Sequence, residues 1–284
     1  ASANTDAASA ADGSAAAGGG ASDATIGAAV ALTLANVTNR ATVPATLTVT
    51  AHDLAVSATV TTDGADVTST FGAEAVSGAG GGKISVAGSF AMTILNHTTR
   101  AGVDGTVNLT GGDASLVAAS NVQTAVKALP HGDGAVATGD AGVGASVALH
   151  FITDRTTAEV SDGVVLAGAR DVSLTATAVD RAVTEARMGA KGGDVAVSPA
   201  VALTFSNITT RSRIGTGVLV TSRTVSMTST QKAAADTTAS AAALGASDAA
   251  IGVGFALTIA NHTVTSTLAR RVSAGGDVVL RAFS

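Results

Sequence analysis

A seven-residue stretch, Val30-Ala-Leu-Thr-Leu-Ala-Asn36, recurs four more times along the chain and decides the fold. The copies are Phe90-Ala-Met-Thr-Ile-Leu-Asn96, Val147-Ala-Leu-His-Phe-Ile-Thr153, Val201-Ala-Leu-Thr-Phe-Ser-Asn207 and Phe255-Ala-Leu-Thr-Ile-Ala-Asn261. Their first residues, at 30, 90, 147, 201 and 255, are 60, 57, 54 and 54 positions apart. This spacing predicts a repeat protein. Its units are residues 28–87, 88–144, 145–198, 199–252 and 253–284, with residues 1–27 as the remainder of a preceding unit.

Within each copy, the first, third and fifth residues are large and apolar, whereas the second is Ala and the fourth is Thr or His150. A period of two predicts a strand. A Phe at the first position goes with Ile at the fifth, and in the third and fourth copies a Val goes with Phe. We therefore expect the large residues to face the core, with one Phe filling each layer. The next apolar column has an odd offset of 13 residues, which predicts a bend or bulge near the Asn position; its members are Val43, Val103, Val160, Ile214 and Leu268.

The composition of the 284 residues bounds the fold further. Aromatic residues make up 2%, all of them Phe, and charged residues 13%, so a thick core of bulky side chains is excluded and a thin one is expected. A hydrophobic fraction of 46% excludes a charged disordered chain. No apolar run reaches the ~18 residues that cross a bilayer. A net charge of -5 with scattered Lys and Arg predicts no nucleic-acid partner, and zero Cys excludes disulfides and thiolate metal sites.

The fold class that these observations predict is all-β, a parallel β-solenoid of about five stacked units. A second strand signal in most units follows an Asp, at Asp53, Asp113, Asp171 and Asp277. The Ala-rich runs from Ala1 to Ala17 and from Ala233 to Ala250 lack a bulky stripe and are predicted to be extended. The alternative is an antiparallel β-sandwich, in which Gly78–Gly82 and Gly192–Asp194 are hairpin turns.

The order of segments resembles the repeats of giant bacterial extracellular adhesins, the filamentous haemagglutinin and autotransporter-like proteins. The matching stretches are Phe90 to Val103 (FAMTILNHTTRAGV), Val201 to Ile214 (VALTFSNITTRSRI) and Gly276 to Ala282 (GDVVLRA). The resemblance covers essentially the whole chain, but its motifs have low complexity, so it bears on architecture more than on activity. It implies secretion to the cell surface and a stalk or adhesive role.

Four Asn residues at one repeat position form N-x-T sequons, and Asn108-Leu-Thr is a fifth sequon elsewhere. They are either glycan acceptors or a structural ladder in which each Asn stacks on the Asn of the next coil, and we favour the ladder. Thr153 interrupts the column in the third unit. The four residues are Asn36, Asn96, Asn207 and Asn261.

Two charged columns also follow the repeat. Arg40, Arg100 and Arg211 align, and we interpret them as a solvated edge rather than as a site for anionic partners. The Asp column could hold Ca²⁺ between coils, but one Asp per coil supplies too few oxygen ligands, so turn chemistry is the favoured explanation. The five His residues do not cluster, and neither a metal nor a cofactor is expected.

The third unit departs furthest from the repeat, with His150, Asp154, Arg155 and Glu159. These residues alternate between strand faces and need not converge, so no catalytic residue is proposed and no enzyme is expected. We expect a non-enzymatic extracellular stalk or fibre segment of a bacterial surface adhesin. Its partners would be neighbouring repeats or identical chains end to end, or glycans and proteins of a host or cell surface, without membrane insertion. Alternatives are a filament subunit that assembles head to tail, since the chain begins and ends at one phase of its repeat, and a flat-faced binder of ice or carbohydrate.

Overall fold

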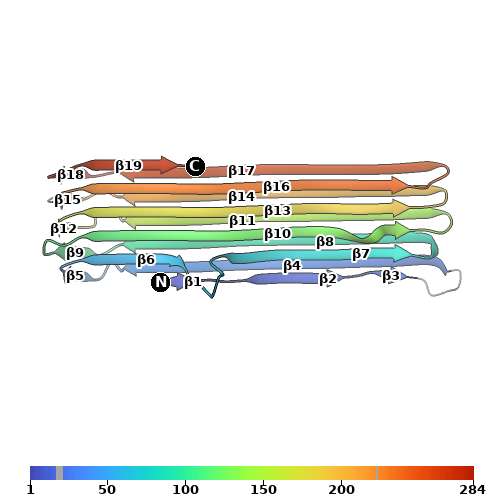
Figure 1. Cartoon of the computed structure of the whole chain (residues 1–284), viewed down its shortest axis with the longest axis horizontal. Coiled ribbons are helices and arrows are strands. Elements are labelled where there is room, and N and C mark those ends of the chain that lie inside the picture. The colour runs from blue at the N-terminus through green and yellow to red at the C-terminus, as the bar shows by residue number, and fades with distance from the viewer. Residues whose placement is uncertain (17–21, 222) are drawn as a thin grey trace.

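Each repeat unit forms one coil of a parallel β-solenoid in the computed structural model, which describes residues 1–16, 22–221 and 223–284 (Figure 1). A coil consists of a long strand, a short strand and a second long strand that returns over the first. The predicted solenoid is confirmed, because all ladders between the named strands are parallel. The sandwich alternative is wrong. Gly78–Gly82 and Gly192–Asp194 connect strands of two different sheets, not neighbours within one sheet.

The recurring stretch lies in the first strand of each coil, and these five strands form one sheet, the motif sheet. Its strands are β4 (Ser22–Val43), β8 (Gly82–Val103), β11 (Ala141–Val160), β14 (Val195–Ile214) and β17 (Ala249–Leu268). The spacings found in the sequence are the registers of these ladders, so that Val30, Phe90, Val147, Val201 and Phe255 lie side by side.

The second long strands form the return sheet, which covers one face of the motif sheet (Figure 1). As predicted, most of both Ala-rich runs is extended, although Ala17 lies outside the described residues. The run from Ala233 to Ala250 ends its return-sheet strand at Leu244, turns, and begins β17 of the motif sheet at Ala249. The strands of the return sheet are β1 (Ser2–Ala3), β2 (Ala7–Asp12), β3 (Ala15–Ala16), β6 (Leu54–Val60), β7 (Ser69–Gly80), β10 (Ala114–Val136), β13 (Val172–Lys191), β16 (Val225–Leu244) and β19 (Val278–Phe283).

The short strands form an edge sheet that closes one side of the solenoid. They are β5 (Thr48–Ala51), β9 (Thr106–Leu109), β12 (Leu166–Ala169), β15 (Val218–Thr221) and β18 (Arg271–Ala274). Where the three sheets meet, the space is wide enough for a core of Val, Leu and Met, as at Val103, Leu116, Leu174 and Met227, all fully buried.

The prediction that the large first, third and fifth residues of the recurring stretch face the core is wrong. Ala91, Ala148 and Ala202 at the second position are fully buried, in a cluster whose members are almost all Ala. The large neighbours point outward: Val30 is 61% exposed and Leu34 is 70% exposed.

The width of the core between the two long sheets changes along the strands. Ala side chains let the backbones of the two sheets approach closely at the Ala columns. Further along the same strands, larger residues fill the space, and Phe71, Leu95 and Ile152 are buried between the sheets.

The predicted bend near the Asn position is also wrong, for the same reason. Each motif-sheet strand runs without interruption through this position, and inward and outward residues alternate along its whole length. Val30 faces outward, so an odd offset of 13 residues places Val43 inward, with Val103, Val160 and Ile214 fully buried in the same column. One continuous strand satisfies both apolar columns.

Glycines with positive φ mark irregular points of the return sheet. The register between β7 and β10 shifts between Pro130 and Ala135, where Gly132 and Gly134 have φ values of 59° and 85°. A Cβ on Gly134 would lie 2.2 Å from the carbonyl oxygen of Gly189, so the bulged segment sits directly on the next coil. Within the described residues, the structure contains no helix that could span a membrane.

Candidate functional site

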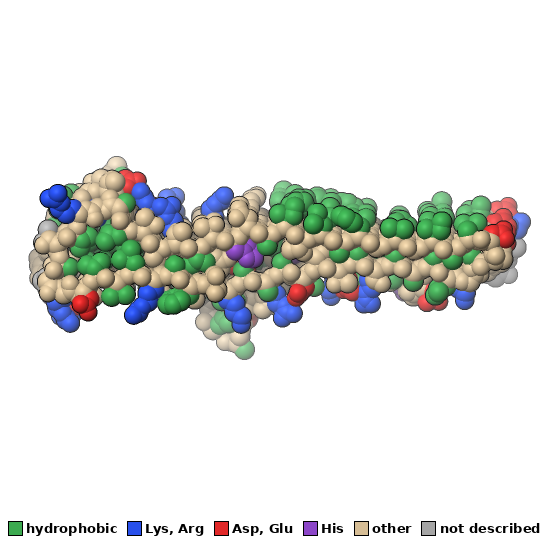
Figure 2. Space-filling model, turned by 90° about the horizontal axis from the view of Figure 1, so that it is seen from above, with side chains coloured by type: hydrophobic (Ala, Val, Ile, Leu, Met, Phe, Trp, Pro, Cys, Tyr) green, Lys and Arg blue, Asp and Glu red, His purple; other side chains and the backbone are tan. Residues whose placement is uncertain are grey.

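The outer surface of the motif sheet carries an apolar patch that spans all five coils. The outward residues of β4 from Ala24 to Leu34 are all apolar, and so is every residue in register with them on β8, β11, β14 and β17. We call this set of positions the apolar face. Seen from above, its side chains on β17 project from one long edge of the molecule (Figure 2). On the C-terminal coil, Ile251, Val253, Phe255, Leu257 and Ile259 are between 39% and 57% exposed.

Two aromatic rings lie in the Leu34 column, at the border of the apolar face nearest the Asn column. Phe151 and Phe205, neighbours in β11 and β14, stack with ring centroids 5.1 Å apart and an interplanar angle of 2°. Their coil-to-coil alignment holds both rings in one orientation, and aromatic stacking of this kind stabilises a pair by about 1 kcal/mol beyond burial. The stacked pair therefore holds the two Phe side chains in fixed positions on the apolar face.

The outer surface of the return sheet has a different character. It carries charged pairs, with Lys127 Nζ 3.9 Å from the Glu74 carboxylate and Arg187 Nε 2.5 Å from Glu185. Arg181 and Lys232 are also exposed on this surface. The outer surface of the return sheet is therefore charged, and that of the motif sheet carries the apolar face. Both sheets pack on the same thin core.

A buried polar cluster lies between the two sheets at the third coil. The Asp154 carboxylate is fully buried, 2.8 Å from His97 Nδ1, and it accepts a 2.9 Å hydrogen bond from the Ser120 hydroxyl. Ser120 is also 2.7 Å from the Thr156 hydroxyl. Asp180 is buried beside this group, and within the described residues neither of its carboxyl oxygens has a hydrogen-bond partner. Burial, with the neighbouring Asp154 carboxylate, raises the pKa of Asp180 well above its ordinary value.

A chain of hydrogen-bonded hydroxyl groups continues this polar interior. His150 Nδ1 lies 2.9 Å from the Thr184 hydroxyl, which accepts a 2.7 Å hydrogen bond from Thr204. Thr237 bonds both Thr204 and Thr258, so the chain crosses three coils. Burial lowers the pKa of His150 to about 4, because its imidazole has no water to stabilise the charged form.

The four residues singled out in the third coil separate onto two faces. His150 and Asp154 point into the core, whereas Arg155 and Glu159 point outward. Glu159 accepts a 2.9 Å hydrogen bond from Arg213 and a 3.4 Å bond from Arg100, so it belongs to an ion-pair network beside the edge sheet. Of the inward pair, Asp154 belongs to the polar cluster, whereas His150 belongs to the chain of hydroxyl groups.

The Asn column lies on the outer surface, next to the apolar face, and all four Asn side chains are exposed. Asn96 Nδ2 donates a 3.0 Å hydrogen bond to Asn36 Oδ1 across adjacent coils. Asn207 and Asn261 occupy the same column two coils further along. Glycosylation of these residues stays a prediction.

The two charged columns lie where the repeat places them. Arg100 donates to both carboxylate oxygens of Asp104, at 2.9 and 2.5 Å, while Arg40 and Arg211 form no ion pair within the described residues. The Asp column caps backbone N–H groups of the following coil. Asp53 accepts from the N–H of Asp113 at 2.7 Å, and Asp171 accepts from that of Thr224 at 2.9 Å. No group of three or more His, Asp or Glu residues placed to hold a metal occurs in the described part of the chain.

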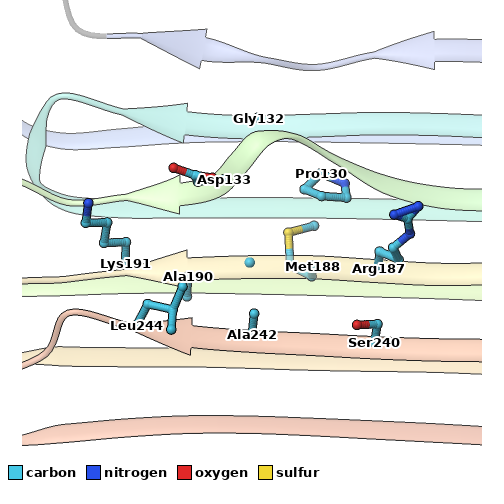
Figure 3. A pocket seen from close by; sticks show the side chains of 11 residues that line it. Pro130, Gly132, Asp133, Arg187, Met188, Ala190, Lys191, Ser240, Ala242 and Leu244 are labelled. Carbon is cyan, nitrogen blue, oxygen red and sulfur yellow. The ribbon is translucent and has the colours of Figure 1, made fainter.

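A groove of about 310 Å³ runs beneath the bulge of β10 on the outer surface of the return sheet (Figure 3). Asp133 lies on the arch of the bulge, and Arg187 and Lys191 lie toward opposite ends of the groove on β13. Ala242 and Leu244 of β16 form part of its apolar lining. All three charged groups are at the surface, so the groove resembles a shallow surface depression more than a closed binding pocket.

Sequence reasoning missed the apolar face and the polar cluster. It placed the large residues inside, because a buried bulky side chain is the usual arrangement. The signal for the cluster was present: His150 and Asp154 replace Thr and hydrophobic or His residues at their repeat positions. The inward face of the strand was assigned wrongly, so His150 and Asp154 were not placed in the core.

Replacing Asp180 by Asn should raise the free energy of unfolding at neutral pH by roughly 1–3 kcal/mol, since an amide removes a carboxyl group that burial and Asp154 oppose in its charged form. The raised pKa means that the native protein loses stability as pH rises above the ordinary value of 3.8. The gain from Asp180→Asn should therefore shrink toward zero on acidification. Urea unfolding at several pH values measures it. A variant that is less stable than wild type at neutral pH would contradict the assignment.

The chain matches no known protein-family model, no curated protein and no solved structure.

Proposed function

We propose that this chain is a segment of the stalk or fibre of a bacterial extracellular adhesin, with a mechanical and interactive role and no catalytic one. The observation that carries the proposal is the equivalence of the coils. The column that starts at Ala31 is Ala in all five coils, and the column that starts at Leu32 is Leu or Met. A stack built on such rules can be lengthened by further coils without a new kind of contact.

Polar ladders between coils support a load-bearing role. Asp53, Asp113 and Asp171 each accept a backbone N–H of the next coil, and the Thr chain joins coils through the core. Arg270 donates to the backbone carbonyl group of Thr216, one coil away, and to that of Ser161, two coils away. These bonds add to the continuous parallel ladders, so that separating two coils requires many hydrogen bonds to break together.

A subunit of a head-to-tail filament is the second candidate. The end coils present unpaired sheet edges within the described residues: inward positions of β16 beyond Gln231 are only partly buried, and β17 is exposed on both faces. Unpaired edges of this kind accept further strands. The apolar surface favours these structural roles over ice binding. A measurement that shows no thermal hysteresis would establish that the chain does not bind ice.

Protease treatment of intact cells that express the native gene tests the stalk proposal. We expect the segment to be removed from intact cells while a cytoplasmic marker protein survives, because a stalk lies outside the cell. Electron microscopy of the purified chain separates the two candidates, with discrete particles expected for a stalk segment and long fibres for a filament subunit. Recovery of the intact segment from the cytosolic fraction would overturn both.

A further inference from the structure

The apolar face is large enough to form a stable protein interface. Five strands spaced by about 4.8 Å and eleven residues rising about 3.3 Å each give roughly 24 Å by 36 Å, or about 850 Å². A standard interface buries about 800 Å² on each partner. The largest apolar patch of a typical monomer is only about 300–600 Å². The observed face has the area that a partner of similar size would cover.

The side chains of the apolar face complement a second copy of the same face. Its six columns start at Ala24, Ile26, Ala28, Val30, Leu32 and Leu34, so its midline runs between the Ala28 and Val30 columns. A twofold axis along this midline reverses strand direction and sets each column of one half of the face against a column of the other half.

On this axis every Phe of the face meets a residue without a ring. Phe90 meets Gly88, Phe255 meets Val253, Phe151 meets Ala141 and Phe205 meets Val195. Large side chains thus lie opposite smaller ones, which avoids overfilling the interface.

We propose that the apolar face binds a second copy of this chain, face to face and with reversed strand direction, on a twofold axis parallel to the solenoid axis. The two solenoid axes are then parallel, so coil pairs with equivalent coil along the stack. This inference concerns the lateral surface and does not depend on the proposed stalk function. Phe90, Phe151, Phe205 and Phe255 are the anchors of the interface.

Charge substitutions at Leu203 and Val197 test the proposal, because the twofold axis sets Leu203 of one copy against Val197 of the other. We expect the wild-type chain to sediment as a dimer at micromolar concentration. Leu203→Lys should weaken dimerisation by at least about 100-fold, since it buries two unpaired charges in an apolar interface. Val197→Glu should do the same. An equimolar mixture of the two variants should restore a dimer that contains one of each, in which the introduced ammonium group faces the introduced carboxylate.

Val179→Lys is the matched control, because Val179 is 38% exposed on the return sheet and lies on the opposite side of the molecule. It should leave dimerisation unchanged, and circular dichroism should show that every variant keeps its β structure. A monomeric wild-type chain would overturn the proposal, as would a dimer that Leu203→Lys leaves intact. Binding of the monomeric wild-type chain to phosphatidylcholine vesicles would assign the face to lipid instead. None of these results bears on where the protein is located in the cell.

Discussion

Replacing Ala148 by Leu is expected to lower the free energy of unfolding by about 3 kcal/mol. Ala148 is fully buried between Ala91 and Ala202 of the neighbouring coils, in a core made almost entirely of Ala. A Leu side chain at this point would have to push the motif and return sheets apart. Because the sheets are continuous across coils, the strain would spread to the neighbouring layers. Urea-induced unfolding measured by circular dichroism gives the change.

Ala234→Leu is the matched control for this prediction. It introduces the same side chain at an exposed position on the outer surface of the return sheet, away from the apolar face. Its effect should stay within about 0.5 kcal/mol, as for surface substitutions in general. If Ala234→Leu proved the more destabilising of the two, the assignment of small residues to this part of the core would be incorrect.

Acidification is expected to lower the free energy of unfolding by about 3 kcal/mol through protonation of His150 alone. Its pKa is about 4 in the folded chain, against an ordinary value of 6.5 for a solvated imidazole, and this difference corresponds to about 3 kcal/mol. Between these pH values the unfolded chain binds a proton that the folded chain does not, so stability falls as pH decreases from 6.5 and reaches its full loss below about 4.

His150→Thr isolates this effect, because Thr93 and Thr204 occupy the equivalent position in the adjacent coils. The other buried polar groups nearby are present in both proteins, so their contributions cancel in the comparison. The stability of wild type relative to His150→Thr should therefore decline steadily from about pH 7 to about pH 4. Thermal melts across this range give the comparison, and a constant difference would show that His150 is not held neutral by burial.

The sequence predicted the solenoid and the register of every motif-sheet ladder. Equal spacing of similar residues is enough for this, because stacked coils place equivalent positions in contact. The sequence did not reveal which side of the strand faces inward. Alternation of large and small residues specifies two faces but not their orientation, and burial of Leu32 and Val30 was the natural assumption.

The offset between two apolar columns of the sequence does indicate which face of the strand points inward. The Val43 column is apolar and stands at an odd offset from Val30, and only one of the two columns can point inward on a continuous strand. Assigning Val43 to the core and Val30 to the surface requires no bend, whereas the opposite choice required one in every coil. The polar cluster around Asp154 was unpredictable for another reason, because its members come from two coils and two sheets.

The outward orientation of the large residues also changes how the repeat is understood. The compensation between Phe and aliphatic residues in four of the coils, as at Phe90 and Ile94, belongs to the outer surface rather than to the core. The proposed second copy would cover these exposed apolar side chains. Two stalks paired in this way would run side by side with their axes parallel, which would stiffen both.

Thiol labelling of single-Cys variants tests the central claim most directly, since the natural chain contains no Cys. Ala202→Cys and Leu203→Cys differ by one position on β14 and should lie on opposite faces. At nanomolar protein concentration, the thiol at position 203 should react with a maleimide at nearly the rate of the unfolded chain, while the thiol at position 202 should react only after unfolding. Protection at 203 should appear as the concentration rises and dimers form. Rapid labelling at 202 with protection at 203 at every concentration would contradict the account.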